Sequence, residues 1–423
     1  MNYANIINEP LEKQNKFINK LDYVMIFLLI YVSSSFYMAT LPGMLILGIQ
    51  YGCIFIIFIM SMLNGREISI NSNMAIKMLT LVVIIGMGSM SARGDETKQT
   101  IINISYILIS YLYALNYDFN DFIRKFANVI YFLCYFSIIV YFIYMIVPDV
   151  VELLPDVYNT NNIKAENALF STIYGGVNAR NQSIFWEPGA FQTYIVLALL
   201  IEMFYLNGIS KKRMIIYATT MLTTFSTAGY ITALFVVYTY VTQLLFISSD
   251  ENKKSTRNIF FVLTLVIILV IVFLSLNSGV ADHVFGKFDD YRRLGAHPTK
   301  TTTASVRFDA FIKPFKVFWH YPMFGAGTRG MTNFAYGERY NMNTCTFINW
   351  FAYFGIFFGA MMMQMYYKFA KRFSNNKIVV FMIFFALFLA TATENYYRNP
   401  SILIFAFFPL NEKGETKKNE QNT

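Results

Sequence analysis

Long apolar segments recur along the chain and alternate with short polar ones. A helix needs about 20 residues to cross the hydrocarbon core of a bilayer, or somewhat fewer when neighbouring helices bury its ends. The pattern therefore predicts an all-α polytopic membrane protein with about 12 spans. The spans are expected at residues 21–40, 43–63, 74–91, 100–116, 126–147, 188–206, 214–228, 229–247, 258–276, 345–367, 378–393 and 400–410.

Basic residues set the expected orientation, because Lys and Arg in short loops stay on the cytoplasmic side. Clusters precede the first, fifth, seventh, ninth and eleventh spans, and another follows the last. The clusters are Lys13, Lys16 and Lys20; Arg124 and Lys125; Lys211, Lys212 and Arg213; Lys253, Lys254 and Arg257; Lys368, Lys371, Arg372 and Lys377; and Lys413, Lys417 and Lys418. With twelve crossings every cluster lies on one side, so both termini are predicted to be cytoplasmic.

This topology divides the chain into seven parts. They are a cytoplasmic segment at 1–20, spans one to five within 21–147, an outer loop at 148–187, spans six to nine within 188–276, a larger outer loop at 277–344, spans ten to twelve within 345–410, and a cytoplasmic tail at 411–423. Long loops in compact proteins usually serve a function. The two outer loops are therefore where we expect the site.

Composition supports a membrane protein and excludes several other classes. Hydrophobic residues make up 56% of the chain and charged residues 14%, against about 25% charged in soluble domains. The net charge of +9 is mostly accounted for by the cytoplasmic clusters, so nucleic-acid binding is not expected. The first 20 residues lack the pattern of a cleaved signal peptide. The three cysteines, Cys53, Cys134 and Cys345, have no spacing that suggests a disulfide or a zinc site.

The larger outer loop is basic although it is expected to face outward. Its arginines include Arg293, Arg307, Arg329 and Arg339. Long loops escape the positive-inside rule, so this charge favours an anionic substrate or lipid headgroups. Aromatic and basic residues mixed over 306–319 predict a helix lying in the membrane interface.

Three other features of this loop have structural interpretations. Pro314 is expected to kink or divide the interfacial helix. The GxGxxG pattern at 325–330 has no preceding strand and no acidic partner, so we expect a flexible turn rather than a dinucleotide site. Asp289 and Asp290 lack the further oxygen ligands that a divalent ion needs. No metal and no cofactor is predicted.

Arg180 lies near the end of the smaller outer loop. The segment Phe185-Trp186-Glu187-Pro188-Gly189 follows it and runs into the next expected span. Proline favours the first helical turn, and a carboxylate there complements the helix dipole. Glu187 is thus either a helix cap or a functional acid or base. Free amides at an outward-facing helix start also bind anions, and arginine binds phosphate in a bidentate manner. The pair Arg180 and Glu187 favours a phosphate or carboxylate substrate.

At these residues the chain resembles the O-antigen polymerase and ligase family. Arg180 with Phe185 to Gly189 is similar to the family's arginine and (F/W)EPG segment. Ser305-Val306-Arg307, followed by Pro322-Met323-Phe324-Gly325-Ala326-Gly327, is similar to its arginine and P-x-F-G-x-G loop. Thr224 to Tyr230 is a third match, to a segment that often reads Ser-Arg-Thr-Gly. The final Thr393-Glu394-Asn395 segment also fits.

The resemblance implies a metal-independent, inverting glycosyltransferase of GT-C-type architecture at the outer face of the bacterial cytoplasmic membrane. Arg180 and Arg307 would bind the pyrophosphate of an undecaprenyl-pyrophosphate-linked oligosaccharide, and Glu187 is the candidate base. Further candidate substrate-binding residues are Arg293, Arg329, Arg339, Glu394 and Arg398. For Glu394 and Arg398 the alternative is that they pair with each other. A chain-length regulator is a further partner implied by the family alone.

The ligase branch usually has a histidine about eleven residues before a glycine that looks like Gly355 here, and residues 342–345 contain none. This departure favours a polymerase. His320 is expected to be structural. The alternatives are a ligase of the same fold and a flippase for lipid-linked repeat units, which has similar hydropathy but usually carries charged residues inside several spans.

Overall fold

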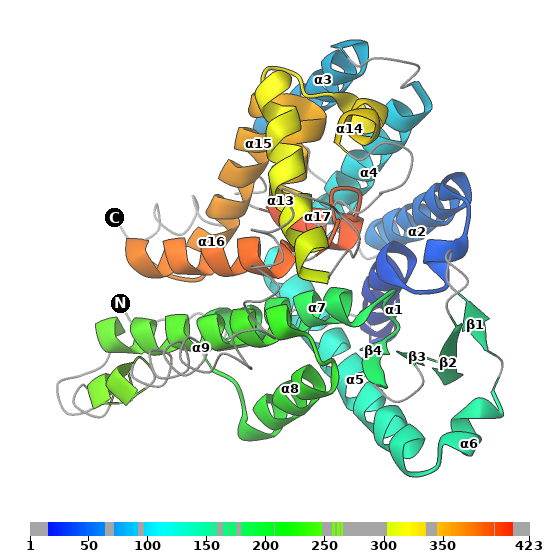
Figure 1. The fold of residues 1–423 in the computed structure, drawn as a ribbon, viewed down its shortest axis with the longest axis vertical. Helices are drawn as coiled ribbons and strands as arrows, with labels where there is room; N and C mark the ends of the chain where they lie inside the picture. The colour runs from blue at the N-terminus through cyan, green and yellow to red at the C-terminus, as the bar shows by residue number, and fades with distance from the viewer. Residues whose placement is uncertain are drawn as a thin grey trace, which may run out of the picture.

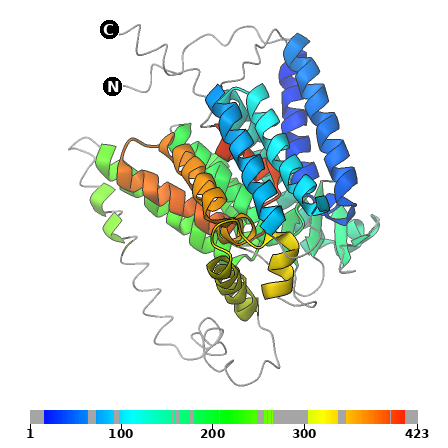
Figure 2. The same ribbon diagram turned by 90° about the horizontal axis from the view of Figure 1, so that it is seen from above.

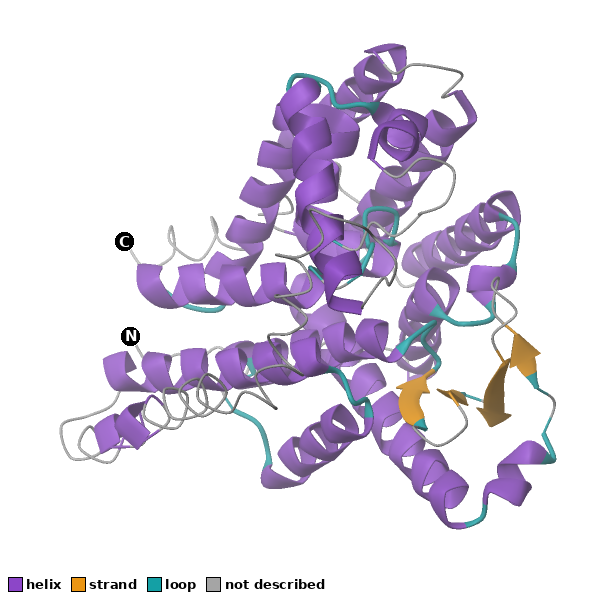
Figure 3. Cartoon of the chain, viewed as in Figure 1, coloured by secondary structure: helices purple, strands orange, loops and turns teal. Residues whose placement is uncertain are grey.

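The computed structural model describes most of the chain. The described residues are 16–63, 72–91, 97–154, 156–158, 164–168, 170–174, 179–206, 208–247, 256–258, 260–262, 264, 303–335, 345–392 and 394–408. Helices dominate them, as Figure 3 shows.

Within these residues, five helices are long and apolar enough to cross a membrane. They are Gly43–Met62, Phe119–Ile146, Pro188–Tyr205, Thr227–Phe246 and Thr346–Lys371. Two shorter apolar helices cover Ala75–Met90 and Lys377–Thr391. The structure is thus that of a mainly helical protein with membrane-spanning segments, whereas the total of about 12 spans stays a prediction.

Helices lie at the expected apolar segments wherever the structure describes them. They are α1 (Lys16–Ser34), α2 (Gly43–Leu63), α3 (Ser72–Ser91), α4 (Thr97–Asn116), α5 (Phe119–Ile146), α7 (Pro188–Leu200), α8 (Lys211–Thr223), α9 (Thr227–Ile247), α15 (Thr346–Lys371), α16 (Lys377–Thr391) and α17 (Pro400–Phe407). The expected ninth span, 258–276, lies almost wholly outside the described residues. The boundary expected at Gly229 falls earlier, because α8 ends at Thr223 and α9 begins at Thr227.

The loop expected at 148–187 contains a small four-stranded antiparallel sheet, an addition to the mainly helical fold that the sequence did not predict. After a short helix α6 (Pro148–Glu152) come β1 (Val157–Tyr158), β2 (Lys164–Ala168), β3 (Ser171–Tyr174) and β4 (Arg180–Ser183), paired in that order. Polar side chains anchor β4 to the helices. The amide of Asn181 donates to the hydroxyls of Ser137 on α5 and Thr223 on α8, both at 3.1 Å.

Helix α7 is the centre of the described bundle. All thirteen of its residues are buried, and it contacts α5, α8, α9, α16 and β4 (Figure 1). Its last turn widens into a π-helix, η3 (Ile201–Tyr205). A short 3₁₀ helix, η2 (Met38–Thr40), follows α1. Because α7 is packed on all sides, its two ends are fixed relative to the other helices.

Helix α15 is interrupted at Gly355, whose φ of +80° is not helical. The segment 322–327 lies against this break. The backbone amide of Ala326 donates to the carbonyl oxygen of Ala352 at 2.9 Å, and the backbone amide of Ile356 donates to the carbonyl oxygen of Pro322 at 2.8 Å. Gly325, with φ of +72°, is so close to α15 that a Cβ would lie 2.3 Å from the Tyr353 carbonyl carbon. Gly325 to Gly327, the first residues of the turn expected to be flexible, are therefore buried, and segment 322–327 forms a hydrogen-bonded joint with α15.

Two helices flank that joint. Helix α13 (Thr303–His320) continues through Pro314, which was expected to kink or divide it, and packs against α15. Helix α14 (Gly327–Ala335) begins within the GxGxxG segment. Figure 2 shows α13, α14 and the sheet at the same end of the helical bundle.

Buried ion pairs lie at the opposite end of the helices. Lys125 on α5 contacts Asp22 on α1 and Asp121, both at 2.7 Å, and it is 3% exposed. Arg213 at the start of α8 pairs with Glu202 in η3 and donates to it through Nε at 2.8 Å. All five residues belong to helix ends that the charge pattern assigns to the cytoplasmic side.

Candidate active site

Glu187 occupies the N-cap position of α7 without capping it. Pro188 starts the helix, and the amides of Ala190 and Phe191 bond to the backbone carbonyl of Glu187. The carboxylate makes no side-chain capping bond. An N-cap carboxylate usually accepts from the second or third amide of its helix. The interpretation of Glu187 as a simple cap is therefore not supported, and its half-buried carboxylate points elsewhere.

Glu394 faces the same helix start from more than 200 residues further along the chain. A Cβ on Gly189 would lie 2.5 Å from Oε1 of Glu394 and 3.3 Å from Oε1 of Glu187. The Trp186 indole donates to Oε2 of Glu394 at 3.2 Å, and Glu394 is 4% exposed. The helix start was expected to bind the substrate's pyrophosphate, but the protein's own carboxylate lies there. The positive end of the helix dipole favours this placement.

The segment between α16 and α17 is held against both α7 and α15. The Thr346 hydroxyl donates to the carbonyl of Glu394 and accepts from the amide of Tyr396, each at 2.8 Å. The Tyr396 hydroxyl donates to the carbonyl of Ala190 at 3.3 Å. Burial and then the nearby Glu394 carboxylate raise the pKa of Tyr396 well above its usual value. Tyr396 is thus a neutral phenol beside the two carboxylates.

Arg398 has partners other than Glu394. Its Nε donates to Asn103 Oδ1 at 2.6 Å, and its Nη2 donates to Gln99 at 2.7 Å and to Thr328 at 3.3 Å. Its guanidinium also lies 4.8 Å from the ring centre of Tyr397. The expected alternative of a pair between Glu394 and Arg398 is therefore wrong. Arg398 instead joins α4 to the start of α14.

Arg180 lies at the start of β4 and reaches the loop between α8 and α9. Its Nε donates to the carbonyl of Thr224 at 3.0 Å, and its Nη2 donates to that of Phe225 at 3.2 Å. Phe225 has a positive φ of 48°, in the turn between the two helices. Two of the three segments that carry the family resemblance, 180–189 and 224–230, are thus in direct contact.

The remaining candidates are placed less closely. Arg307 lies on α13, and its side chain is outside the described part of the structure. Arg329 is exposed on α14, next to Thr328. Arg293 and Arg339 lie outside the described residues, as do Asp289 and Asp290. Nδ1 of His320 contacts the carbonyl of Lys316 at 2.9 Å at the end of α13, in keeping with a structural role.

Sequence reasoning missed several residues that organise this region. Trp186 was noted only as part of a motif, yet it links the helix start to Glu394. Gln99, Asn103 and Thr328 form the surroundings of Arg398. Polar groups inside an apolar span are usually functional, and this rule could have singled out Asn103 within the expected span 100–116.

Comparisons with known proteins leave the family resemblance as a proposal. The chain matches no family model, no curated protein and no solved structure.

Proposed function

We propose that the protein is a polysaccharide polymerase. It transfers a growing glycan from undecaprenyl pyrophosphate to a lipid-linked repeat unit on the outer side of the cytoplasmic membrane of a bacterium. The observation that carries the proposal is the meeting of two carboxylates, Glu187 and Glu394, at Gly189 where α7 begins. Paired carboxylates in a partly buried site are suited to proton transfer.

The proposed reaction is a displacement at the anomeric carbon of the donor sugar. A hydroxyl of the acceptor sugar gives its proton to Glu187, and its oxygen forms the new glycosidic bond. The bond between the anomeric carbon and the pyrophosphate breaks, and the pyrophosphate leaves with the electron pair. Nothing is oxidised or reduced. Glu394, fixed by Trp186 and placed beside Glu187, is the second carboxylate through which that proton can be shared.

The negative charge that grows on the leaving pyrophosphate needs fixed positive charge nearby. Arg180 and Arg307 are proposed to provide it. Two backbone carbonyls hold Arg180 in place, so its position does not have to reorganise during the reaction. Such preorganised charge is usually a major part of catalysis.

The two ends of the bundle support an outward-facing site. The contacts of Arg180, Trp186 and Arg398 join segments that the charge pattern assigns to the outer side, namely 180–187, 224–225, 394–398, 328 and the start of α4. The buried ion pairs join segments assigned to the inner side. Had the expected spans been misplaced by one crossing, outer and inner segments would contact each other.

Complementation of cells that lack the protein tests the proposal. Arg180→Ala and Arg307→Ala are each expected to lower polymerisation at least about 100-fold, as loss of one charge-stabilising donor does in other enzymes. Cell-surface glycan would then consist of single capped units. Arg257→Ala, which removes an exposed arginine from the expected inner side, is the control and leaves long chains. Normal polymer length in both test variants contradicts the proposal.

Reconstitution separates this function from its alternatives. Purified protein in proteoliposomes with lipid-linked repeat units lengthens them if it is a polymerase. A flippase only moves the repeats across the bilayer. A ligase leaves their length unchanged and, when a lipid-core or protein acceptor is added, attaches the glycan to it.

A further inference from the structure

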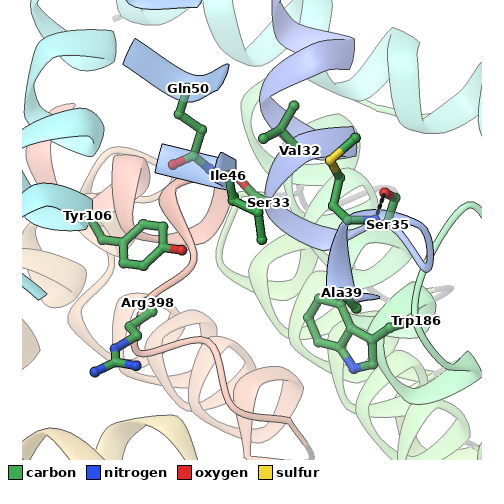
Figure 4. Close-up of a pocket in the computed structure, with 10 residues that line it drawn as sticks. Val32, Ser33, Ser35, Ala39, Ile46, Gln50, Tyr106, Trp186 and Arg398 are labelled. Carbon is green, nitrogen blue, oxygen red and sulfur yellow. Dashed lines mark hydrogen bonds between the residues drawn. The ribbon is translucent and has the colours of Figure 1, made fainter. Parts of the chain in front are cut away.

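A cavity adjoins the carboxylate pair without including it. It lies between the end of α1, η2, α2 and α4, and Trp186 and Arg398 close its remaining side (Figure 4). Its enclosed space is about 70 Å³, and the cavity opens to solvent. A water molecule occupies about 30 Å³ in the liquid. The enclosed part therefore suits one edge of a small polar ligand, and the rest of that ligand can lie in the open part.

Gln50 is the informative residue of this cavity. It is a polar residue inside the apolar helix α2 and is 1% exposed. Its Nε2 donates to the Ser33 hydroxyl at 3.3 Å, whereas its Oε1 has no hydrogen-bond partner among the described residues. Figure 4 shows its amide directed toward the cavity, with the Tyr106 hydroxyl opposite. A buried acceptor without a partner is costly, so the site favours a ligand that donates a hydrogen bond.

The charged groups around the cavity argue against an anionic ligand. The Arg398 guanidinium is bonded to three side-chain oxygens outside it, and in Figure 4 its nitrogens lie away from Gln50. Only the aliphatic stem of Arg398 is therefore offered to a ligand. Behind Trp186 lies the buried carboxylate of Glu394, which repels negative charge. Among the described residues that line the cavity, a phosphate or acidic headgroup would find no available cation.

The uncharged part of the lining is half polar and half apolar. Gln50, Ser33 and Tyr106 offer hydrogen bonds, while Val32, Ile46 and the Trp186 ring offer apolar surface. A sugar ring matches both, because its hydroxyls donate and accept hydrogen bonds and its C–H face packs on aromatic rings. We propose that this cavity binds a neutral sugar residue of the acceptor, an assignment that rests on the proposed polymerase function.

Trp186 connects the cavity to the chemistry. Its ring lines the cavity, while its indole nitrogen bonds to Glu394. A sugar bound against this ring therefore lies next to the carboxylate pair, where its hydroxyl can be deprotonated. The donor's pyrophosphate, bound by the arginines, approaches from another side. Trp186 and Gln50 are thus binding residues for the acceptor, distinct from the residues proposed to bind the pyrophosphate.

Direct binding tests the cavity without any reaction. The detergent-solubilised full chain is titrated by saturation-transfer NMR with methyl glycosides of glucose, galactose, mannose, rhamnose and N-acetylglucosamine, and with inorganic phosphate. At least one glycoside is expected to bind, with affinity lowered at least tenfold in Gln50→Leu and Tyr106→Phe. Gln243→Leu is the matched control, because Gln243 on α9 also has a buried amide oxygen without a partner but does not line the cavity. Gln50→Leu removes a buried hydrogen-bond acceptor that has no partner in the described part of the chain, so this variant is expected to fold.

Each result of this titration has a clear meaning. Binding of a glycoside that Gln50→Leu weakens and Gln243→Leu leaves unchanged supports the proposal. Three results overturn it: no glycoside binds to the wild-type chain, a glycoside binds equally well to Gln50→Leu, or phosphate is the one probe whose binding the cavity variants weaken.

Kinetics with lipid-linked repeat units separates this proposal from the polymerase function. In proteoliposomes, Gln50→Leu and Tyr106→Phe are expected to raise the KM for the acceptor at least tenfold with little change in kcat, whereas Arg180→Ala lowers kcat. If wild-type protein does not polymerise but binds a glycoside through Gln50, the proposed function fails and the sugar site stands. If polymerisation occurs and these variants leave the acceptor KM unchanged, the sugar site fails and the function stands.

Discussion

The carboxylates of Glu187 and Glu394 share one small space, since an oxygen of each lies within 3.3 Å of the point where Gly189 would carry a Cβ. Glycine is the residue that leaves this space open. The two acids come from segments more than 200 residues apart, and they meet at the start of the buried helix α7.

Gly189→Ala is expected to abolish polymerisation with little loss of stability. The new methyl group would displace the Glu394 carboxylate, which is the far end of a flexible side chain. Alanine also favours the helix over glycine by about 0.5–1 kcal/mol, which offsets part of the cost. Polymer length in cells and thermal unfolding in detergent measure the two effects. Gly86→Ala, on α3 with open space around it, is the control, and an active Gly189→Ala variant would contradict the proposed role of the pair.

Gly355→Ala, in the joint with segment 322–327, is expected to cause a large loss of stability, unlike Gly189→Ala. A Cβ there would lie 2.1 Å from the carbonyl oxygen of Met323, and its φ of +80° is strained for alanine. The backbone conformation alone costs about 1–3 kcal/mol. Gly355→Ala is therefore expected to lower the unfolding temperature clearly more than Gly52→Ala, which has open space on α2. Equal temperatures for the two variants would show that the joint is not under this constraint.

The buried pair of Asp22 and Lys125 is expected to be needed for folding. Lys125→Met leaves the Asp22 carboxylate, 1% exposed, without its cation. Removing one partner of a buried pair costs about 3–5 kcal/mol, while replacing both by apolar residues is often neutral. Asp22→Leu combined with Lys125→Met is therefore expected to be more stable than Lys125→Met alone. Asp156→Ala removes only the more exposed partner of Lys164, which keeps Glu166, and is expected to leave thermal unfolding unchanged.

Topology can be tested by labelling introduced cysteines. Tyr158 on β1 and Lys211 at the start of α8 are both exposed, and the three native cysteines are buried. A membrane-impermeant maleimide is expected to label Tyr158→Cys in intact cells and Lys211→Cys only after permeabilisation. The reverse pattern would invert the orientation, and labelling of both from outside would place the two residues on the same side.

Much of the helical fold followed from hydropathy, but the sheet did not. The strands are two to five residues long and read as polar loops, for example Lys-Ala-Glu-Asn-Ala in β2. Strand β4 is buried because Asn181 and Gln182 find hydroxyl partners on other elements, and local sequence does not show such partners. The boundary near Gly229 was misplaced for a related reason, since apolar and threonine residues run continuously across the turn at Thr224.

The sequence identified residues of the candidate site but not which of them contact one another. Arg180 and Glu187 were expected to serve one anionic substrate, and within the protein Arg180 contacts the loop after α8 while Glu187 meets Glu394. Glu394 and Arg398 lie between the last two expected spans, and one alternative was that they pair with each other. Here the segment is irregular, and the two side chains take partners in different elements.

The joint between segment 322–327 and α15 is made by main-chain groups and by the lack of side chains at Gly325 and Gly355. The joint therefore constrains the backbone conformation at these positions and not the chemistry of their side chains. Side chains at neighbouring positions can diverge while the joint persists, so a glycine motif at this place records how the helices are assembled and carries little information about the proposed substrate.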